Sequence, residues 1–147
     1  MNSNLKHETI HCQLCVVGGG LSGCFVALAA ARRGVKVVLV QDRPVLGGNA
    51  SSEVRMWVRG AKGKWNRETG LLSEWEERNI HFNPTLSHPV QDAVLYGMLY
   101  ENPNIRILLN ASCADASMNG NRVESITAWQ STTYTWITVE ADLFADC

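Results

Sequence analysis

The sequence predicts an α/β fold built on a parallel sheet, and two of its stretches carry most of that prediction. In the first, an apolar run from Leu14 to Val17 leads into Gly18-Gly19-Gly20-Leu21-Ser22-Gly23 and then into an alanine-rich segment. The second is a series of β-type segments after Ile105. A strand, a glycine turn, a helix and a second strand in this order form a βαβ unit with a right-handed crossover and parallel strands.

Length and composition set the class of protein. The chain has 147 residues, 46% of them hydrophobic and 18% charged, which suits one globular domain with a core of its own. A net charge of −1 gives no basic field for nucleic acid or an anionic membrane. No apolar run approaches the roughly 20 residues that span a bilayer. The polar N-terminus lacks the apolar core of a secretory signal, so we expect a cytoplasmic protein without nucleic-acid or membrane partners.

Five cysteines occur without the spacing of a disulfide framework. Cys12-x-x-Cys15 raises the possibility of a redox or zinc site, but a zinc site needs two more ligands and the sequence has no second C-x-x-C or H-x-x-x-H. Cys15 lies within the apolar run, where a reduced cysteine behaves as a small hydrophobe. We predict no metal site, and we assign no metal role to His81 or His88 either.

The elements are predicted in chain order from periodicity, capping residues and breakers. Residues 1–11 are expected to form a loose leader. The predicted helices are Leu21 to Arg33, ended by Gly34; Gly70 to Asn79, capped by Thr69; and a helix that starts at Pro89 and runs to Glu101. The predicted strands are Cys12 to Val17, Val35 to Val40, Ile105 to Asn110, Ser112 to Met118, Arg122 to Gln130, Thr133 to Glu140, and a buried parallel strand from Leu143 to Cys147. Asn119-Gly120-Asn121 predicts a hairpin.

The glycine motif is the strongest functional signal. Gly18 would allow a tight turn, Gly20 would let the backbone approach a pyrophosphate, and Gly23 would let the helix pack closely on the strand. The helix that starts at Leu21 and Ser22 would offer free N–H groups and a positive dipole end to the phosphates. The sequence therefore predicts a dinucleotide site.

The end of the second strand is where such sites contact the adenosine ribose, usually through an acidic residue. Gln41 occupies this position, and Asp42 follows as an alternative. Gln41 can exchange hydrogen bonds with hydroxyl groups but carries no charge. Arg43 could meet a 2′-phosphate, so NADP remains an alternative cofactor. A second glycine pair, Gly47-Gly48 followed by Asn49, suggests a further stretch of backbone close to the ligand.

Three stretches, VVGGGLSG, VVLVQDRPVLGGNASSEVRM and LFADC, resemble the FAD-dependent oxidoreductase family whose FAD domain is like that of glutathione reductase. The resemblance implies a three-layer Rossmann-like fold, with helices on one face of a central parallel sheet and a β-meander on the other. It also implies that the first motif holds the pyrophosphate and that the Leu-Gly-Gly loop passes the pyrophosphate and ribityl. The predicted cofactor-binding residues are Gly18, Gly20, Leu21, Ser22, Gly23, Gln41, Asp42, Arg43, Gly47, Gly48 and Asn49.

Basic residues and tryptophans alternate between Ser51 and Arg67, where a short strand from Val54 and a helix are both compatible with the pattern. A solvated face, base stacking, and contact of Arg55 or Arg59 with an anionic substrate or the flavin are the interpretations we weigh. Arg55 is the candidate catalytic residue, and no other acid or base in the chain stands out.

The expected function is hydride transfer between FAD and a small-molecule substrate, with the chain as the N-terminal, truncated part of a larger flavoenzyme. The family's strand leads into a further FAD-contacting turn and a substrate domain that are not part of this sequence. An NADP-dependent oxidoreductase domain and a non-catalytic nucleotide-binding fragment are the alternatives.

Overall fold

The computed structural model describes residues 5–58 and 69–147. In chain order its elements are β1 (Lys6–Val17), α1 (Leu21–Ala31), β2 (Val37–Val40), the 3₁₀ turn η1 (Gly48–Ala50), α2 (Gly70–Phe82), α3 (His88–Tyr100), β3 (Ile105–Leu108), β4 (Ala111–Asn119), β5 (Arg122–Gln130) and β6 (Thr135–Asp146). The latter part of the basic stretch, including Arg59 and Arg67, lies outside the described residues.

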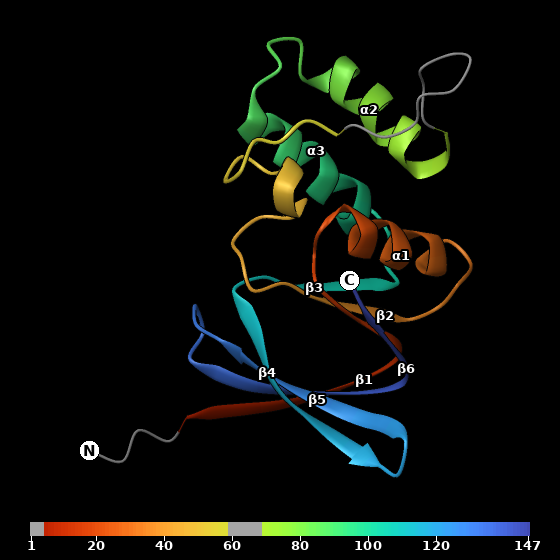
Figure 1. Cartoon of the computed structure of the whole chain (residues 1–147), viewed down its shortest axis with the longest axis vertical. Coiled ribbons are helices and arrows are strands. Elements are labelled where there is room, and N and C mark those ends of the chain that lie inside the picture. The colour runs from red at the N-terminus through yellow and green to blue at the C-terminus, as the bar shows by residue number, and fades with distance from the viewer. Residues whose placement is uncertain (1–4, 59–68) are drawn as a thin grey trace.

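Six strands form one mixed sheet in the order β3-β2-β1-β6-β5-β4. β1 is parallel to β2 and to β6, β2 is parallel to β3, and β4 and β5 run antiparallel. The helices lie on one side of β1–β3, and the β4–β5 hairpin extends away from them (Figure 1). The predicted parallel sheet, helices and β-meander are therefore all present.

Two cores, one on each face of the parallel strands, explain why β2 is buried along its whole length. Val37 and Leu39 pack toward α1 and α3, in a core that includes Leu28 and Leu99. The alternate residues of β2 and neighbouring strands pack toward the meander, in a second core. Side chains on a strand alternate between faces, so a strand covered on both faces reads as a continuous apolar run.

β1 and β6 are long strands that belong to both layers, and this arrangement corrects two predictions. Residues 6–11 are the first half of β1, paired with residues 135–140 of β6, and do not form a loose leader. All of these residues except the buried Ile10 are polar and exposed, so the segment lacked the apolar signal of a buried strand. The segments predicted as Thr133 to Glu140 and Leu143 to Cys147 are one strand, β6. Its end is not buried, since β5 pairs only with its first half and Leu143 is 67% exposed.

The helical layer differs from the prediction in smaller ways. α2 continues to Phe82, so His81 is helical, not part of a loop. Thr69 occupies the N-cap position of α2, but its side chain makes no capping hydrogen bond. Residues 55–58 form no strand. Arg32 at the end of α1 holds Glu74 of α2 through two hydrogen bonds of 2.7 Å, which ties the α2–α3 pair to the rest of the layer.

Candidate functional site

The first glycine segment turns sharply between β1 and α1, and each motif glycine has a different environment. Gly18 has a φ of +105°, and a Cβ there would collide with the Cys147 carbonyl oxygen. A Cβ on Gly23 would collide with the Gly18 carbonyl oxygen. Gly20 has an ordinary φ of −64°, and a Cβ there would meet no heavy atom of the described chain within 4 Å. Gly18 and Gly23 are thus required by the fold, whereas Gly20 borders open space.

The second glycine pair lies beside the first. Gly47 and Gly20 form an isolated parallel bridge, and the Gly47 N–H donates to the Gly19 carbonyl over 2.8 Å. Gly47 and Gly48 have φ values of +107° and +56°, and a Cβ on Gly48 would lie 3.2 Å from the Gly20 Cα. Two segments without side chains therefore meet beside the open space at Gly20, although 27 residues separate them in the chain.

The N-terminus of α1 points toward this space. Its first internal hydrogen bond runs from the Cys24 N–H to the Gly20 carbonyl, so the N–H groups of Leu21, Ser22 and Gly23 have no helical partner. No acidic residue lies in its first turn. The positive end of the helix dipole is therefore available to an anion. The Cys24 thiol donates to the Gly19 carbonyl over 3.4 Å, and burial raises the pKa of this thiol to about 12.

The Gln41 side chain links the first glycine segment to the loop that precedes the second one. Its side chain is buried; Oε1 accepts from the Gly19 N–H over 2.8 Å, and Nε2 donates to the Val45 carbonyl over 3.0 Å. A carboxylate could accept from Gly19 in the same way but could not donate to Val45. The primary role that the structure assigns to Gln41 is to hold the loops together, while its predicted ribose contact stays a prediction.

A cavity of about 240 Å³ opens at the carboxyl ends of β1 and β2. Gln41 and Asp42 lie on one wall, and residues 111–113 at the start of β4 lie on the other. Motif reasoning did not identify the β4 residues, because nothing in the local sequence shows that β4 starts beside the end of β2. Arg43 is exposed and does not line this cavity; its Nη1 lies 3.8 Å from Glu53 Oε2.

Two residues of α3 that the sequence analysis did not single out hold the segment after Gly48. Gln91 Nε2 donates to the Ala50 carbonyl over 2.8 Å. Both carboxylate oxygens of the buried Asp92 accept from the Ser52 N–H, at 3.0 and 3.2 Å. The N-terminal half of α3 therefore fixes the backbone that follows the second glycine pair.

Asn49 and Arg55, both predicted site residues, are exposed. The Asn49 carbonyl accepts from the Met56 N–H, which closes the loop between them. Arg55 has a φ of +62°, and its Nε donates to the Ser52 carbonyl over 2.9 Å. Its guanidinium is thus turned back on its own loop.

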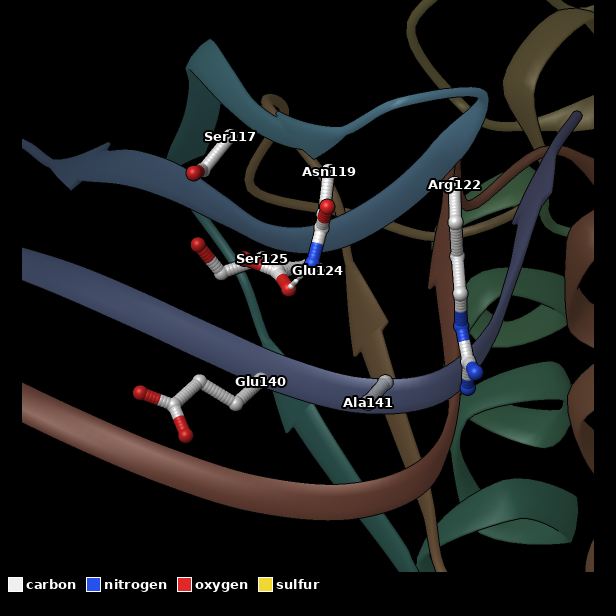
Figure 2. A pocket seen from close by; sticks show the side chains of 7 residues that line it. All are labelled: Ser117, Asn119, Arg122, Glu124, Ser125, Glu140 and Ala141. Carbon is white, nitrogen blue, oxygen red and sulfur yellow. Dashed lines mark hydrogen bonds between the residues drawn. The ribbon is translucent and has the colours of Figure 1, made fainter.

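A larger hollow of about 780 Å³ lies over β4, β5 and β6 (Figure 2). Its charged and amide side chains are engaged with neighbours: Asn119 donates to Glu124, Arg122 donates to the Asp142 carbonyl, and Glu140 lies 3.1 Å from His11 Nδ1. Figure 2 shows Arg122 at the opposite end of the hollow from Glu140, so no group of side chains converges on one point. We therefore place the candidate site at the glycine segments.

In residues 5–58 and 69–147, no three histidine, cysteine, aspartate or glutamate side chains lie close enough to hold a metal ion. No helix in the same part of the chain is long and apolar enough to cross a membrane.

Comparison with solved structures identifies the fold. Glycerol-3-phosphate dehydrogenase from Bacillus halodurans, solved with FAD, superimposes with a TM-score of 0.63 at 16% identity, over 93% of this chain and 34% of that one. The GidA-related protein from Thermus thermophilus gives a TM-score of 0.62 at 20% identity, over 92% of this chain and 52% of that one. At these identities the likeness concerns the fold alone.

Sequence relatives and a family model identify the family. Glycerol-3-phosphate dehydrogenase of Mycobacterium leprae is 36% identical over 77 residues, which are 52% of this chain and 13% of the relative. The fumarate reductase (cytochrome) of Shewanella frigidimarina is 27% identical over 84 residues, 57% of this chain and 14% of the relative. The matched part of this chain thus spans at most about one seventh of the length of these relatives. The model for FAD-dependent oxidoreductases matches residues 13–147, and the chain therefore belongs to that family.

Proposed function

We propose that this chain is the FAD-binding part of an oxidoreductase that passes hydride between flavin and a small-molecule substrate. One observation carries the proposal: the bare backbones of Gly20 and Gly47–Gly48 meet at the N-terminus of α1, where Gly20 borders open space. Backbone without side chains, free N–H groups and a positive dipole end are what a pyrophosphate requires.

The residues present fit FAD when each part of the cofactor is considered. The pyrophosphate would lie over Gly20, within reach of the N–H groups of Leu21, Ser22 and Gly23. Adenosine would occupy the cavity at the ends of β1 and β2, with Asp42 on its wall as the acidic group for the ribose. Gly47, Gly48 and Asn49 would follow the cofactor toward its ribityl chain.

Bound FAD would supply the hydride chemistry, because the isoalloxazine accepts or donates hydride and the protein binds and orients it. The described residues contribute position. Gln41 fixes the distance between the two glycine segments, and Gln91 and Asp92 hold the backbone that leaves the second one. Arg55 stays the candidate for contact with an anionic substrate, which requires its guanidinium to leave the Ser52 carbonyl.

Three finer points remain proposals. The meander formed by β4, β5 and β6 supports a glutathione-reductase-like variant of the FAD domain. The parallel strands contribute to both hydrophobic cores, which supports treating residues 1–147 as one domain. Catalysis would then need a substrate domain from a longer chain. Five cysteines without a disulfide spacing support a cytoplasmic location, and the net charge of −1 supports the absence of nucleic-acid and membrane partners.

Titration of the purified chain with FAD tests the proposal, with NADP as the comparison because Arg43 is exposed near the end of β2. Flavin fluorescence and thermal unfolding are the readouts, because a ligand that binds only the folded state raises the apparent stability. We expect saturation with FAD and none with NADP. A response to NADP alone would refute the proposal, and FAD retained without turnover would favour the non-catalytic alternative.

A further inference from the structure

The corner between β3 and β4 turns the chain within two residues. β3 ends at Leu108 and β4 begins at Ala111, and β4 then runs away from the helices (Figure 1). Asn110 in this corner has a φ of +53°, in the left-handed region of backbone conformations. Asparagine visits this region more readily than other residues with a Cβ, whereas a branched Cβ strongly disfavours it. The corner therefore depends on the type of residue at this position.

Two consecutive N–H groups of the corner hold the carbonyls on either side of Asp42. The Ala111 N–H donates to the Gln41 carbonyl over 2.9 Å, and the Asn110 N–H donates to the Arg43 carbonyl over 3.1 Å. Asp42 itself is exposed at the end of β2. Its backbone is thus fixed to the corner at both of its ends.

The turn between β5 and β6 holds the corner from the other side. Gln130 Nε2 donates to the Leu109 carbonyl over 3.0 Å, and the Ser131 N–H donates to the Asn110 carbonyl over 3.0 Å. Gln130 Oε1 accepts from the Thr133 hydroxyl over 2.8 Å, so the amide is fixed in turn. All of these contacts lie within the chain and need no ligand. The corner is therefore a preorganised support for whatever it holds.

The corner and Asp42 also belong to one cavity. In the cavity of about 240 Å³ at the ends of β1 and β2, Asp42 lies on one wall and Ala111, Ser112 and Cys113 lie on the other. A carboxylate accepts from a hydroxyl group only when the two oxygens lie about 2.5–3.0 Å apart, so a displacement of about 1 Å removes the hydrogen bond. A change in the corner that moves the Asp42 backbone therefore weakens any contact that this carboxylate makes in the cavity.

We propose that Asn110 is a positioning residue for the adenosine end of the cofactor. Its left-handed conformation aims the N–H groups of Asn110 and Ala111 at the carbonyls beside Asp42, and this sets where the Asp42 carboxylate meets the ribose hydroxyls. The proposal rests on the proposed function, because it requires an adenine nucleotide in the cavity. Asn110 acts through its backbone, so glycine can replace it and valine cannot.

The test uses the whole 147-residue chain and two probes, ADP and 2′,3′-dideoxy-ADP, which lacks the ribose hydroxyls. The ratio of their dissociation constants, measured by calorimetric titration, reports on the hydrogen bonds to the ribose alone. We expect the wild-type protein and Asn110→Gly to prefer ADP by about tenfold or more, as a hydrogen bond to a charged group requires. Asn110→Val should bind the two probes equally.

Two further variants separate positioning from a general loss of stability. Leu86→Val places a valine at the same φ of +53° in a turn that does not line the cavity, and it should keep the wild-type preference. Asp42→Ala should abolish the preference. Adding Asn110→Val to Asp42→Ala should then leave the ratio unchanged, because both substitutions act on the same hydrogen bonds.

The proposal is overturned if Asn110→Val keeps the preference for ADP, if Asn110→Gly loses it, or if the wild-type protein binds both probes equally. If Asn110→Val does not fold, Asn110→Ala takes its place, and a preference equal to that of Asn110→Gly would contradict the role of the conformation. A wild-type chain that binds neither ADP nor FAD would refute the proposed function, and this proposal with it. Binding of FAD with a preference that Asn110→Val does not change would refute this proposal alone.

Discussion

Substitution of Gly20 separates the requirements of the cofactor from those of the fold. A valine at Gly20 places its side chain in the open space beside that residue, where no heavy atom of the described chain lies within 4 Å of the Cβ. Its φ of −64° is one that any residue adopts. An alanine at Gly23 instead places its Cβ against the Gly18 carbonyl oxygen, which is backbone and cannot turn aside.

Gly20→Val should therefore weaken FAD binding with little effect on stability, whereas Gly23→Ala should lower the stability of the fold itself. For Gly20→Val without cofactor we expect the free energy of unfolding to change by less than about 1 kcal/mol, since the gain in backbone restriction offsets the poorer N-cap. The valine side chain should remove at least one charge-assisted hydrogen bond to the pyrophosphate. We therefore expect FAD binding to weaken by about tenfold to a hundredfold. Gly23→Ala should lower the free energy of unfolding by about 1–3 kcal/mol through overpacking, or the Tm by about 3–10 °C at this chain length.

The assay combines urea unfolding of the cofactor-free variants with FAD titration followed by flavin fluorescence. Wild-type affinity in Gly20→Val would refute the placement of the pyrophosphate. Unfolding of Gly20→Val as severe as that of Gly23→Ala would show that the space beside Gly20 is needed by the fold itself.

Three further predictions concern the surroundings of the site. Gln41→Leu should lower the free energy of unfolding by about 1–3 kcal/mol in a urea titration, because it leaves the buried Gly19 N–H and the half-buried Val45 carbonyl without this partner. An unchanged midpoint would contradict the role of this amide. The hydrogen bond from Arg32 lowers the pKa of Glu74, so this pair stabilises the fold above about pH 4.3 and the contribution disappears as the pH falls through the lower, folded-state pKa. Arg32→Gln should remove this part of the acid sensitivity, about 0.2–1 kcal/mol for a partly exposed pair, as measured by urea unfolding between pH 7 and pH 3. Burial and a pKa of about 12 should make the Cys24 thiol of the native protein react with iodoacetamide at pH 8 far more slowly than the exposed Cys113, and mass spectrometry of the labelled peptides checks the order.

Local signals predicted the βαβ unit well because they act over short distances along the chain. The glycine motif, the alanine-rich helix and the apolar second strand lie within 27 residues, and each stop signal is adjacent to the element it ends. The hairpin at Gly120-Asn121 was predicted for the same reason, and Asn119 pairs with Arg122 across it. Prediction failed where pairing partners are distant: residues 6–11 are a strand because residues 135–140 lie beside them, and their own composition does not show it.

The candidate site likewise combines residues that local sequence signals predict with contacts that only the tertiary structure creates. The sequence by itself determined which residues lack a side chain at the proposed phosphate site, because a G-x-G-x-x-G turn between strand and helix requires those glycines for steric reasons. The tertiary structure alone decided that Gly47 meets Gly20, that the Gln41 amide is used between the loops, and that Gln91 and Asp92 of α3 hold the segment after the second glycine pair. These contacts join residues 22 to 41 positions apart, and they depend on how the chain returns to the carboxyl ends of the parallel strands, which no local pattern encodes.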